Sequence, residues 1–130
     1  MVGVMKISSI KLSKQARDQL VRLKRTTGIK QWNILCRWAL CMSLADPSIP
    51  PKADIPADSN VEMSWAVFGG DYRDLYLALL KERCHRDGIK ITKNSLMKQL
   101  RLHLHRGIGF LFGDRRIASI SDLISFAINS

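Results

Sequence analysis

The sequence predicts a mainly α-helical protein, with a short strand at its N-terminus followed by a bundle of helices in one compact domain. The chain has 130 residues and is 46% hydrophobic, which suits a single core and leaves little material for a second. Apolar residues recur at helical spacing over most of its length, whereas the alternation typical of strands is confined to short segments. We therefore assign one domain to 1–130, with a strand-helix-helix unit at 5–45, a proline-rich connector at 46–60 and a helical part at 61–130.

The first segment predicts a strand and then an amphipathic helix. Met5 to Leu12 is rich in β-branched and small polar residues, which favours a short strand. Ser13 is suited to cap the N-terminus of a helix, and Gly28 is suited to end it. Apolar residues between them recur on one helix face, namely at Ala16, Leu20 and Leu23.

The next predicted helix, from Gln31 to Leu44, is apolar on nearly every side, and Arg37 is its only charged residue. Such a helix must be covered over most of its surface. One strand and one helix offer too little cover for Trp32, Trp38 and the leucines, so we expect a second copy of the chain to supply the rest. On this ground the sequence predicts a homo-oligomer.

The connector from Asp46 to Asn60 contains all four prolines of the chain and no sustained periodicity, which predicts an extended, partly polyproline segment. Residues 46–74 hold two basic and six acidic residues, so we expect this middle part to be solvated. From Val61 to Phe68, apolar residues alternate before a Gly-Gly pair. A short strand and a single helical turn fit that pattern equally well.

The C-terminal part predicts further helices. The first runs from Asp71 to Cys84, and the second begins at Thr92 or Lys93 and ends at Arg106. We expect the glycines of Gly107-Ile108-Gly109 to break the second helix and to form a turn that permits close packing. A last helix is expected to start near Ser119 or Ser121.

The charge of the chain predicts a polyanionic partner. Lys and Arg number 21 against 11 Asp and Glu, which gives a formal net charge of +10. Residues 1–45 hold nine basic residues and one acid, and residues 75–130 hold ten and four. Nucleic acid is favoured over a membrane surface, because the basic helical faces lie opposite core-type leucines rather than an exposed apolar face.

Two groups of basic residues are candidates for contacts with DNA phosphates, because each lies opposite the apolar face of its predicted helix. The first group is Lys14, Arg17, Lys24 and Arg25, with Lys30 after the helix. The second group is Lys98, Arg101 and His105, with Lys90 and Lys93 at the helix start. Phosphate contacts position a protein without identifying bases, so we expect salt-dependent binding with little sequence preference. A merely solvated charged face is the alternative for either group.

The order strand, helix, turn, helix in 5–45 matches the ribbon-helix-helix fold, in which two chains pair their strands. Repressors of that fold insert the paired strands into the major groove, and the base-reading candidates here are Lys6, Ser8 and Lys11. This strand offers none of the Arg, Asn or Gln side chains best suited to bidentate base contacts. A sequence-specific repressor is therefore the alternative function, and an ordinary edge strand is the alternative structure.

The residues give no catalytic or metal-binding constellation, so we expect a protein without enzymatic activity, metal or cofactor. Cys84 and His85 diverge on a helix because they are adjacent, and His103 and His105 point to opposite faces. Asp71 and Asp74 share a helix face and suit Mg²⁺ in a nuclease, although acids at this place more often favour a helix N-terminus. The glycines of GIGFLFG lack the preceding strand and following Lys of a phosphate loop.

The cysteines predict a reducing compartment. Cys36, Cys41 and Cys84 are odd in number and lack CxxC spacing. The sequence shows neither a signal peptide nor a run of about 18 apolar residues, so we expect a cytoplasmic protein that does not span a membrane.

Four motifs resemble, in order, the DndE family, the E subunit of the Dnd DNA phosphorothioation system. They are MKISSIKLS, TTGIKQWNILCRWAL, EMSWAVFGGDYRDLYLALL and LHLHRGIGFLFG, and the similarity covers nearly all of residues 5–128. The FGG-[DE]-Y segment and the later HRGIG are the most specific parts.

The resemblance implies a small bacterial subunit that works beside a cysteine desulfurase, an iron–sulfur sulfurtransferase subunit and an ATPase subunit. Together these proteins replace a non-bridging phosphate oxygen of DNA with sulfur. The family is ribbon-helix-helix-like, oligomeric and DNA-binding, with a preference for nicked duplex attributed to surface lysines, and it supplies no catalytic residue. We therefore expect a DNA-binding accessory subunit that assembles with itself as a tetramer and with the other subunits.

Overall fold

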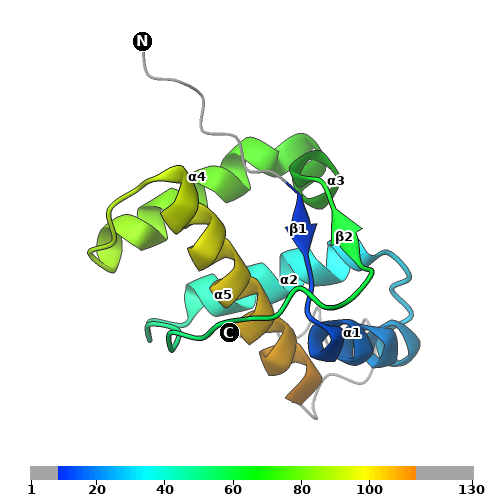
Figure 1. Ribbon diagram of the computed structural model, residues 1–130. Coiled ribbons are helices and arrows are strands. Elements are labelled where there is room, and N and C mark those ends of the chain that lie inside the picture. Colours follow the sequence, from blue (N-terminus) through cyan, green and yellow to red (C-terminus); the bar gives the residue numbers. More distant parts are fainter. Residues whose placement is uncertain (1–8, 114–130) are drawn as a thin grey trace.

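The computed structural model describes residues 9–113, which form a mainly helical domain with a short two-stranded sheet (Figure 1). In chain order the elements are β1 (Ile10–Lys11), α1 (Lys14–Thr27), α2 (Trp32–Ala45), β2 (Glu62–Met63), α3 (Trp65–Gly69), the 3-10 turn η1 (Gly70–Tyr72), α4 (Arg73–Arg86) and α5 (Lys93–Gly113). The predicted helical architecture is thus confirmed. The helix expected near Ser119 or Ser121 lies outside the described residues.

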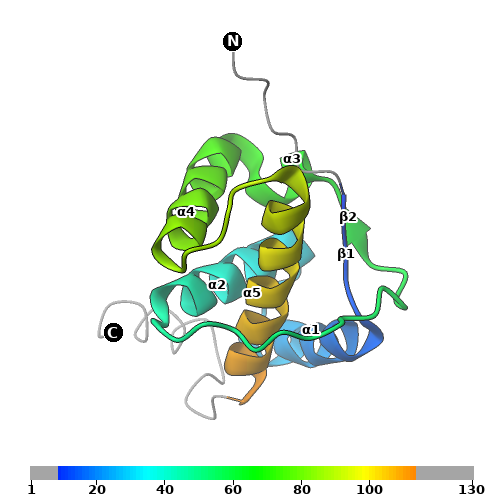
Figure 2. The same cartoon turned by 60° about the vertical axis from the view of Figure 1, so that its left-hand side comes forward.

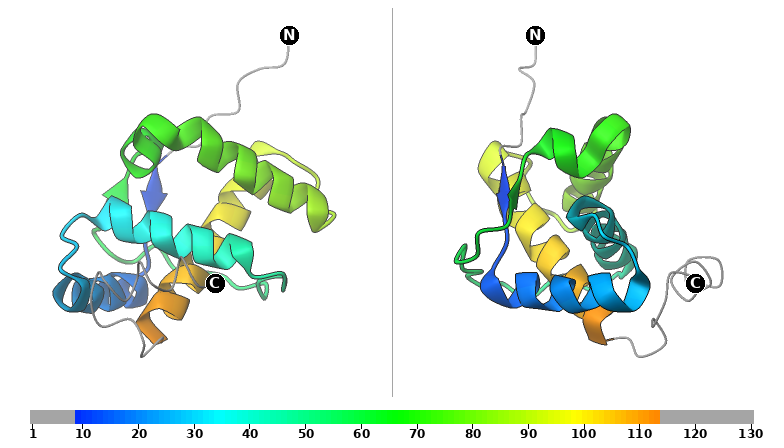
Figure 3. Two further views of the ribbon diagram at one scale, coloured as in Figure 1. Left: turned by 180° about the vertical axis from the view of Figure 1, so that it is seen from behind. Right: turned by 90° about the vertical axis from the view of Figure 1, so that its right-hand side faces the viewer.

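Helix α2 lies at the centre of the domain. Figure 2 shows α5 crossing it, and Figure 3 shows α4, α2 and α1 one above another. Leu35, Leu40, Leu100 and Leu104, which are all fully buried, contribute to the core between these helices. Trp32 and Trp38 are half-buried and pack against the same core, along with Ile34, Met42 and Leu44.

The packing of α2 within one chain corrects the argument that this apolar helix needs a second copy of the chain to cover it. Helices α1, α3, α4 and α5 of the same chain all pack against α2. A second copy is therefore not needed to cover this helix, because the helices after the connector supply cover that the first 45 residues alone do not. Any case for a homo-oligomer has to come from another surface.

Both ends of α1 agree with the sequence signals. The Ser13 hydroxyl accepts a hydrogen bond from the backbone N–H of Ala16 at 3.1 Å, as a helix N-cap does. At the other end, Gly28 adopts φ 77°, and its N–H donates to the Lys24 carbonyl oxygen at 3.1 Å. A left-handed residue is the usual helix C-cap, and glycine adopts it without strain.

The N-terminal strand finds its partner in the same chain. Strand β1 pairs antiparallel with β2, with Ile10 opposite Met63 and Lys11 opposite Glu62. The ambiguous segment from Val61 to Phe68 thus contains both a strand and, in α3, a short helix. The ribbon-helix-helix expectation had the strand pair with a second chain, whereas β1 pairs with β2.

The prediction that Gly107-Ile108-Gly109 breaks the helix is wrong, because α5 continues to Gly113. Gly107 is buried where α5 crosses α2, and a Cβ on it would lie 1.7 Å from the carbonyl oxygen of Ala39. The glycine therefore permits a close approach of two helix backbones. A glycine inside a helix costs about 1 kcal/mol relative to alanine, and the packing of α2 on α5 offsets it.

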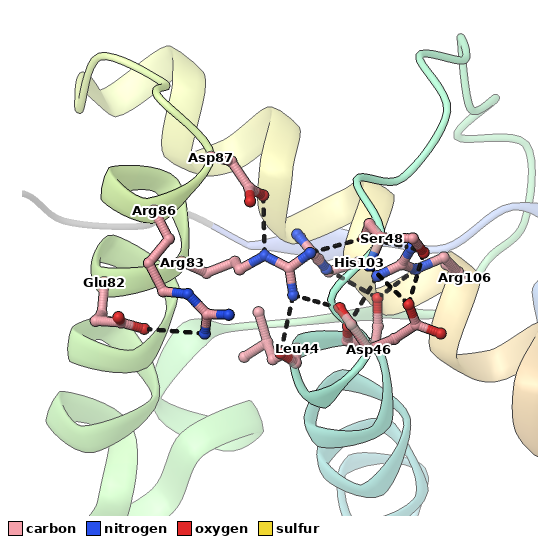
Figure 4. Close-up of polar contacts among 10 residues, drawn as sticks. Leu44, Asp46, Ser48, Glu82, Arg83, Arg86, Asp87, His103 and Arg106 are labelled. Carbon is pink, nitrogen blue, oxygen red and sulfur yellow. Dashed lines mark hydrogen bonds and ion pairs between the residues drawn. The ribbon is translucent and has the colours of Figure 1, made fainter.

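The connector is held along its backbone by arginines, which corrects the expectation of a freely solvated segment. Arg83, only 2% exposed, donates to the carbonyl oxygens of Leu44 (2.9 Å), Asp46 (2.6 Å) and Ser48 (2.7 Å) (Figure 4). Its Nε also forms an ion pair with Asp87 at 2.9 Å. The side chains of the connector are mostly exposed, but these backbone carbonyl groups are bound by Arg83.

Two further arginines bind the same segment from α5. Arg106 donates to the carbonyl oxygen of Ser48 in the connector and to that of Ser43 in α2, each at 2.8 Å (Figure 4). Arg101 donates to the carbonyl oxygen of Ile55 at 2.8 Å, farther along the connector. The connector therefore lies across α5 as a fixed part of the domain (Figure 2).

Candidate nucleic-acid interface

The basic face of α1, consisting of Lys14, Arg17, Lys24 and Arg25, points away from the core. Lys14 and Arg25 are exposed, and Arg17 and Lys24 are partly exposed. Ala16, Leu20 and Leu23 are buried on its other side, as the sequence predicted, and Thr27 is buried as well. The helix therefore offers cationic side chains to solvent without loss of core packing.

The single acid on α1 neutralises little of this face. Asp18 pairs with Arg17 at 2.8 Å, where the Asp18 side chain is exposed and that of Arg17 is partly exposed. Such a surface pair is weak and easily exchanged for a phosphate. Lys30, after the helix, is exposed too.

An open groove lies beside this face, between α1 and the segment that leads into β2. It has a volume of about 750 Å³. Its lining combines cationic, aromatic and aliphatic side chains, including Arg17, Arg22, Arg25, Trp32, Val21 and Val61. Lys24 lies next to it, with its Nζ 4.2 Å from the centre of the Trp32 ring.

Arg22 belongs to this surface although it is absent from the candidates chosen from the sequence. A helical wheel places it at the margin between the apolar and basic sides of α1. In the structure its guanidinium lies 5.6 Å from the centre of the Phe112 ring, and it also lines a second hollow of about 490 Å³ that includes Lys14. Phe112 follows the glycines thought to end α5, so the sequence held no signal for this neighbour.

The second predicted group is only partly a cationic surface. Lys93, the first residue of α5, is exposed, as are Lys90 and Lys98. Arg101 instead donates to three backbone carbonyl oxygens, those of Ile55, Lys11 and Pro56. Its guanidinium is thus engaged within the domain, and we leave it out of the interface.

His105 also has a structural role. Its Nε2 accepts a hydrogen bond from the backbone N–H of Ser13 at 3.1 Å, and its Nδ1 lies 2.8 Å from the Arg101 carbonyl oxygen. Burial lowers the pKa of this imidazole. The neutral ring with a proton on Nδ1 satisfies both contacts. His105 therefore supports the N-terminus of α1 instead of offering a positive charge.

The two exposed groups lie toward different ends of α5. Phe112 lies under Arg22 of α1, whereas Lys98 is fourteen residues earlier in the same helix. At 1.5 Å per residue this separation is about 21 Å along the axis. The interface therefore centres on α1, and Lys90, Lys93 and Lys98 form a separate basic patch.

The candidates for metal or thiol chemistry do not converge. Asp71 lies in η1 and Asp74 in the first turn of α4, both exposed, and residues 9–113 contain no group of three His, Cys, Asp or Glu placed to hold a metal ion. The three cysteines are unpaired thiols. Burial raises the pKa of the Cys36 thiol to about 12, so it is protonated at neutral pH.

A family model for DndE, described as a DNA sulphur modification protein, matches residues 9–119, most of the chain. The chain belongs to the DndE family. The resemblance carried by the four sequence motifs is thereby confirmed, and the DndE family takes part in DNA phosphorothioation.

Solved structures of DndE proteins share this fold. The crystal structure of DndE from Escherichia coli B7A, involved in DNA phosphorothioation modification, is 25% identical, with a TM-score of 0.68 over 83% of this chain and 99% of that chain. The crystal structure of a DndE mutant with two glycines replaced by lysine is 21% identical, with a TM-score of 0.65 over 82% of this chain and 98% of that chain. No curated protein matches the sequence. No helix in the described part of the chain is long and apolar enough to cross a membrane.

Proposed function

We propose that this chain is a non-catalytic, DNA-binding accessory subunit of the DNA phosphorothioation machinery. It binds duplex or nicked DNA through phosphate contacts, in the cytoplasm, beside the iron–sulfur sulfurtransferase and ATPase subunits of the system. Family membership supports the place in the machinery. The basic face of α1 supports the binding.

The observation that carries the proposal is the separation of charge from core on α1. Its buried residues are apolar apart from Thr27, and its basic residues have only Asp18 as an acidic neighbour on the helix. Cations held in this way are available to neutralise phosphates and release counterions. Lys30 and the patch of Lys90, Lys93 and Lys98 add to the positive field.

The sequence-specific repressor has less support than this function. In residues 9–113 the strand β1 has two residues and pairs with β2. Lys11 is the one described base-reading candidate, and it is exposed. Lys6 and Ser8 lie outside the described residues.

We further propose that copies of the chain associate, as a tetramer, through an apolar band on α3, η1 and α4. The band consists of Val67 (56% exposed), Tyr72 (65%), Leu75 (54%) and Leu79 (40%). Tyr72, Leu75 and Leu79 follow one another at helical spacing, so they form a continuous exposed row. This surface replaces the central helix α2 as the ground for a homo-oligomer.

Light scattering on purified protein tests the oligomer. Leu75→Glu together with Leu79→Glu is expected to lower the measured mass toward that of one chain. Ile49→Glu is the control, because Ile49 is 61% exposed and lies in the connector, outside the band. An unchanged mass for the double variant contradicts the interface.

A salt series tests DNA binding. We expect the logarithm of the affinity for intact and for nicked duplex of unrelated sequence to fall linearly with the logarithm of salt concentration, with a slope of about 0.9 per phosphate neutralised. A short operator bound far more tightly than random duplex would favour the repressor. Salt-independent binding, or no binding, contradicts the proposal.

A further inference from the structure

The groove beside α1 combines two kinds of surface that a nucleotide needs. Arg22 and Arg25 supply cations, and Trp32 supplies an aromatic ring among the aliphatic side chains of Val21 and Val61. Its volume of about 750 Å³ lies within the range of small-molecule sites. A plain phosphate-binding surface has no use for the aromatic and aliphatic part.

The groove keeps a net positive charge, because its three arginines, Arg17, Arg22 and Arg25, outnumber its two acids. Asp18 is paired with Arg17 at 2.8 Å, and Glu62 accepts a hydrogen bond from the Ser9 hydroxyl at 2.5 Å. Among the described residues, no carboxylate pairs with Arg22 or Arg25. An anion can therefore approach these two guanidinium groups.

We propose that the groove binds one unstacked nucleotide of a DNA strand, with the base against Trp32 and the phosphate held by Arg22 and Arg25. This inference rests on the proposed DNA-binding function and names the part of DNA that the interface would recognise. Stacking on an aromatic side chain suits any base, and single-strand binders combine such rings with a positive groove in the same way.

A paired base inside an intact duplex cannot reach Trp32, because both of its faces are covered by neighbouring bases. The groove therefore favours DNA in which a base is already free, as in a single strand or a gap. Lys24 now occupies a face of the indole. A base that takes this face displaces the ammonium, whose flexible side chain can turn to the adjacent phosphate.

The test compares two oligonucleotides by fluorescence anisotropy, one single-stranded and one intact hairpin duplex of equal nucleotide number. Trp32→Leu keeps an apolar side chain and removes the ring, so the affinity for the single strand is expected to fall at least about fivefold while that for the duplex stays unchanged. Trp32→Phe is expected to restore the single-strand affinity. Trp38→Leu removes an indole from the same helix outside the groove and is the matched control.

Arg22→Gln together with Arg25→Gln gives a second test of the site. Both arginines are exposed, so this variant is less prone to misfold than a substitution of the half-buried Trp32. The double variant is expected to bind both substrates more weakly, with the larger loss of affinity for the single strand. Equal losses of affinity for both substrates in Trp32→Leu overturn the nucleotide site and leave the proposed function intact. The site is also overturned if Trp32→Leu loses no affinity and the arginine double variant still prefers the single strand. A wild-type protein that binds neither substrate overturns both.

Discussion

Ser43 of α2 and His103 of α5 share a buried hydrogen bond, with 2.8 Å between Oγ and Nδ1. Arg106 donates its Nε to the same hydroxyl at 2.8 Å. The other ring nitrogen of His103 is buried without a partner among the described residues. Burial, and then the positive charges of Arg83 and Arg106, lower the pKa of His103 to about 4. The neutral ring is thus part of the contact between the two central helices.

Acid is therefore expected to destabilise the fold through His103. The pKa of an unfolded histidine is about 6.5, so the stability that comes from the lowered pKa is complete above that pH and is lost as the pH falls toward about 4. Between about pH 7.5 and about pH 5 the free energy of unfolding should fall by about 2 kcal/mol from this group. His105 changes in the same direction, because its pKa is also lowered.

Urea unfolding at the two pH values measures this difference. His103→Gln is expected to reduce the pH dependence, whereas His85→Gln, at an exposed position, should leave it unchanged. The same pH dependence in wild type and His103→Gln would refute the assignment.

A methyl group at Gly107 is expected to force the central helices apart. Gly107→Ala places a Cβ 1.7 Å from the Ala39 carbonyl oxygen. Overpacking against backbone should cost about 3 kcal/mol or more, seen as a lower midpoint in thermal unfolding. Gly109→Ala in the same helix has open space and is expected to stabilise by about 0.5 to 1 kcal/mol. Similar effects of the two substitutions would argue against the helix contact.

Removing the buried guanidinium of Arg83 is expected to be far more harmful than removing an exposed one. Arg83→Ala leaves the Asp87 carboxylate and the carbonyls of Leu44, Asp46 and Ser48 without their donor, which should cost about 3 to 5 kcal/mol in urea unfolding. Arg86→Ala on the same helix breaks a 3.8 Å pair with Glu82 at the surface and should change stability by less than about 1 kcal/mol. A loss of less than about 1 kcal/mol for Arg83→Ala would show that water can replace the guanidinium as hydrogen-bond donor.

Loss of two charges from α1 is expected to weaken DNA binding and its salt dependence. Lys14→Gln with Arg25→Gln should reduce the slope of log affinity against log salt by about 1.8, since each phosphate contact contributes about 0.9. The charge-matched control is Lys52→Gln with Arg86→Gln, in the connector and on α4. An equal change in both double variants would mean that net charge, and not α1, determines binding.

Local signals were enough to predict some of these elements. The limits of α1 follow from Ser13 and Gly28, whose capping roles depend on their immediate neighbours alone. The basic face of α1 was predictable for the same reason, because Ala16, Leu20 and Leu23 define the buried side and exclude the lysines and arginines from it.

Contacts between distant residues account for what the sequence did not predict. Gly107 resembles a helix breaker until Ala39 is known to lie against it. Arg101 lies opposite the leucines of α5 and therefore resembled a solvent-facing cation. The connector covers that side of the helix, and no periodicity within α5 indicates it.

The arginine-bound connector also bears on how the chain can be divided. Proline-rich segments often separate modules that survive limited proteolysis or transfer into a fusion protein. Here Arg83, Arg101 and Arg106 join this segment to helices that come after it in the chain, and β1 before it pairs with β2 after it. The N-terminal unit is thus not a portable DNA-binding module: its first strand, its helix cap and its central helix all depend on residues from the other side of the prolines.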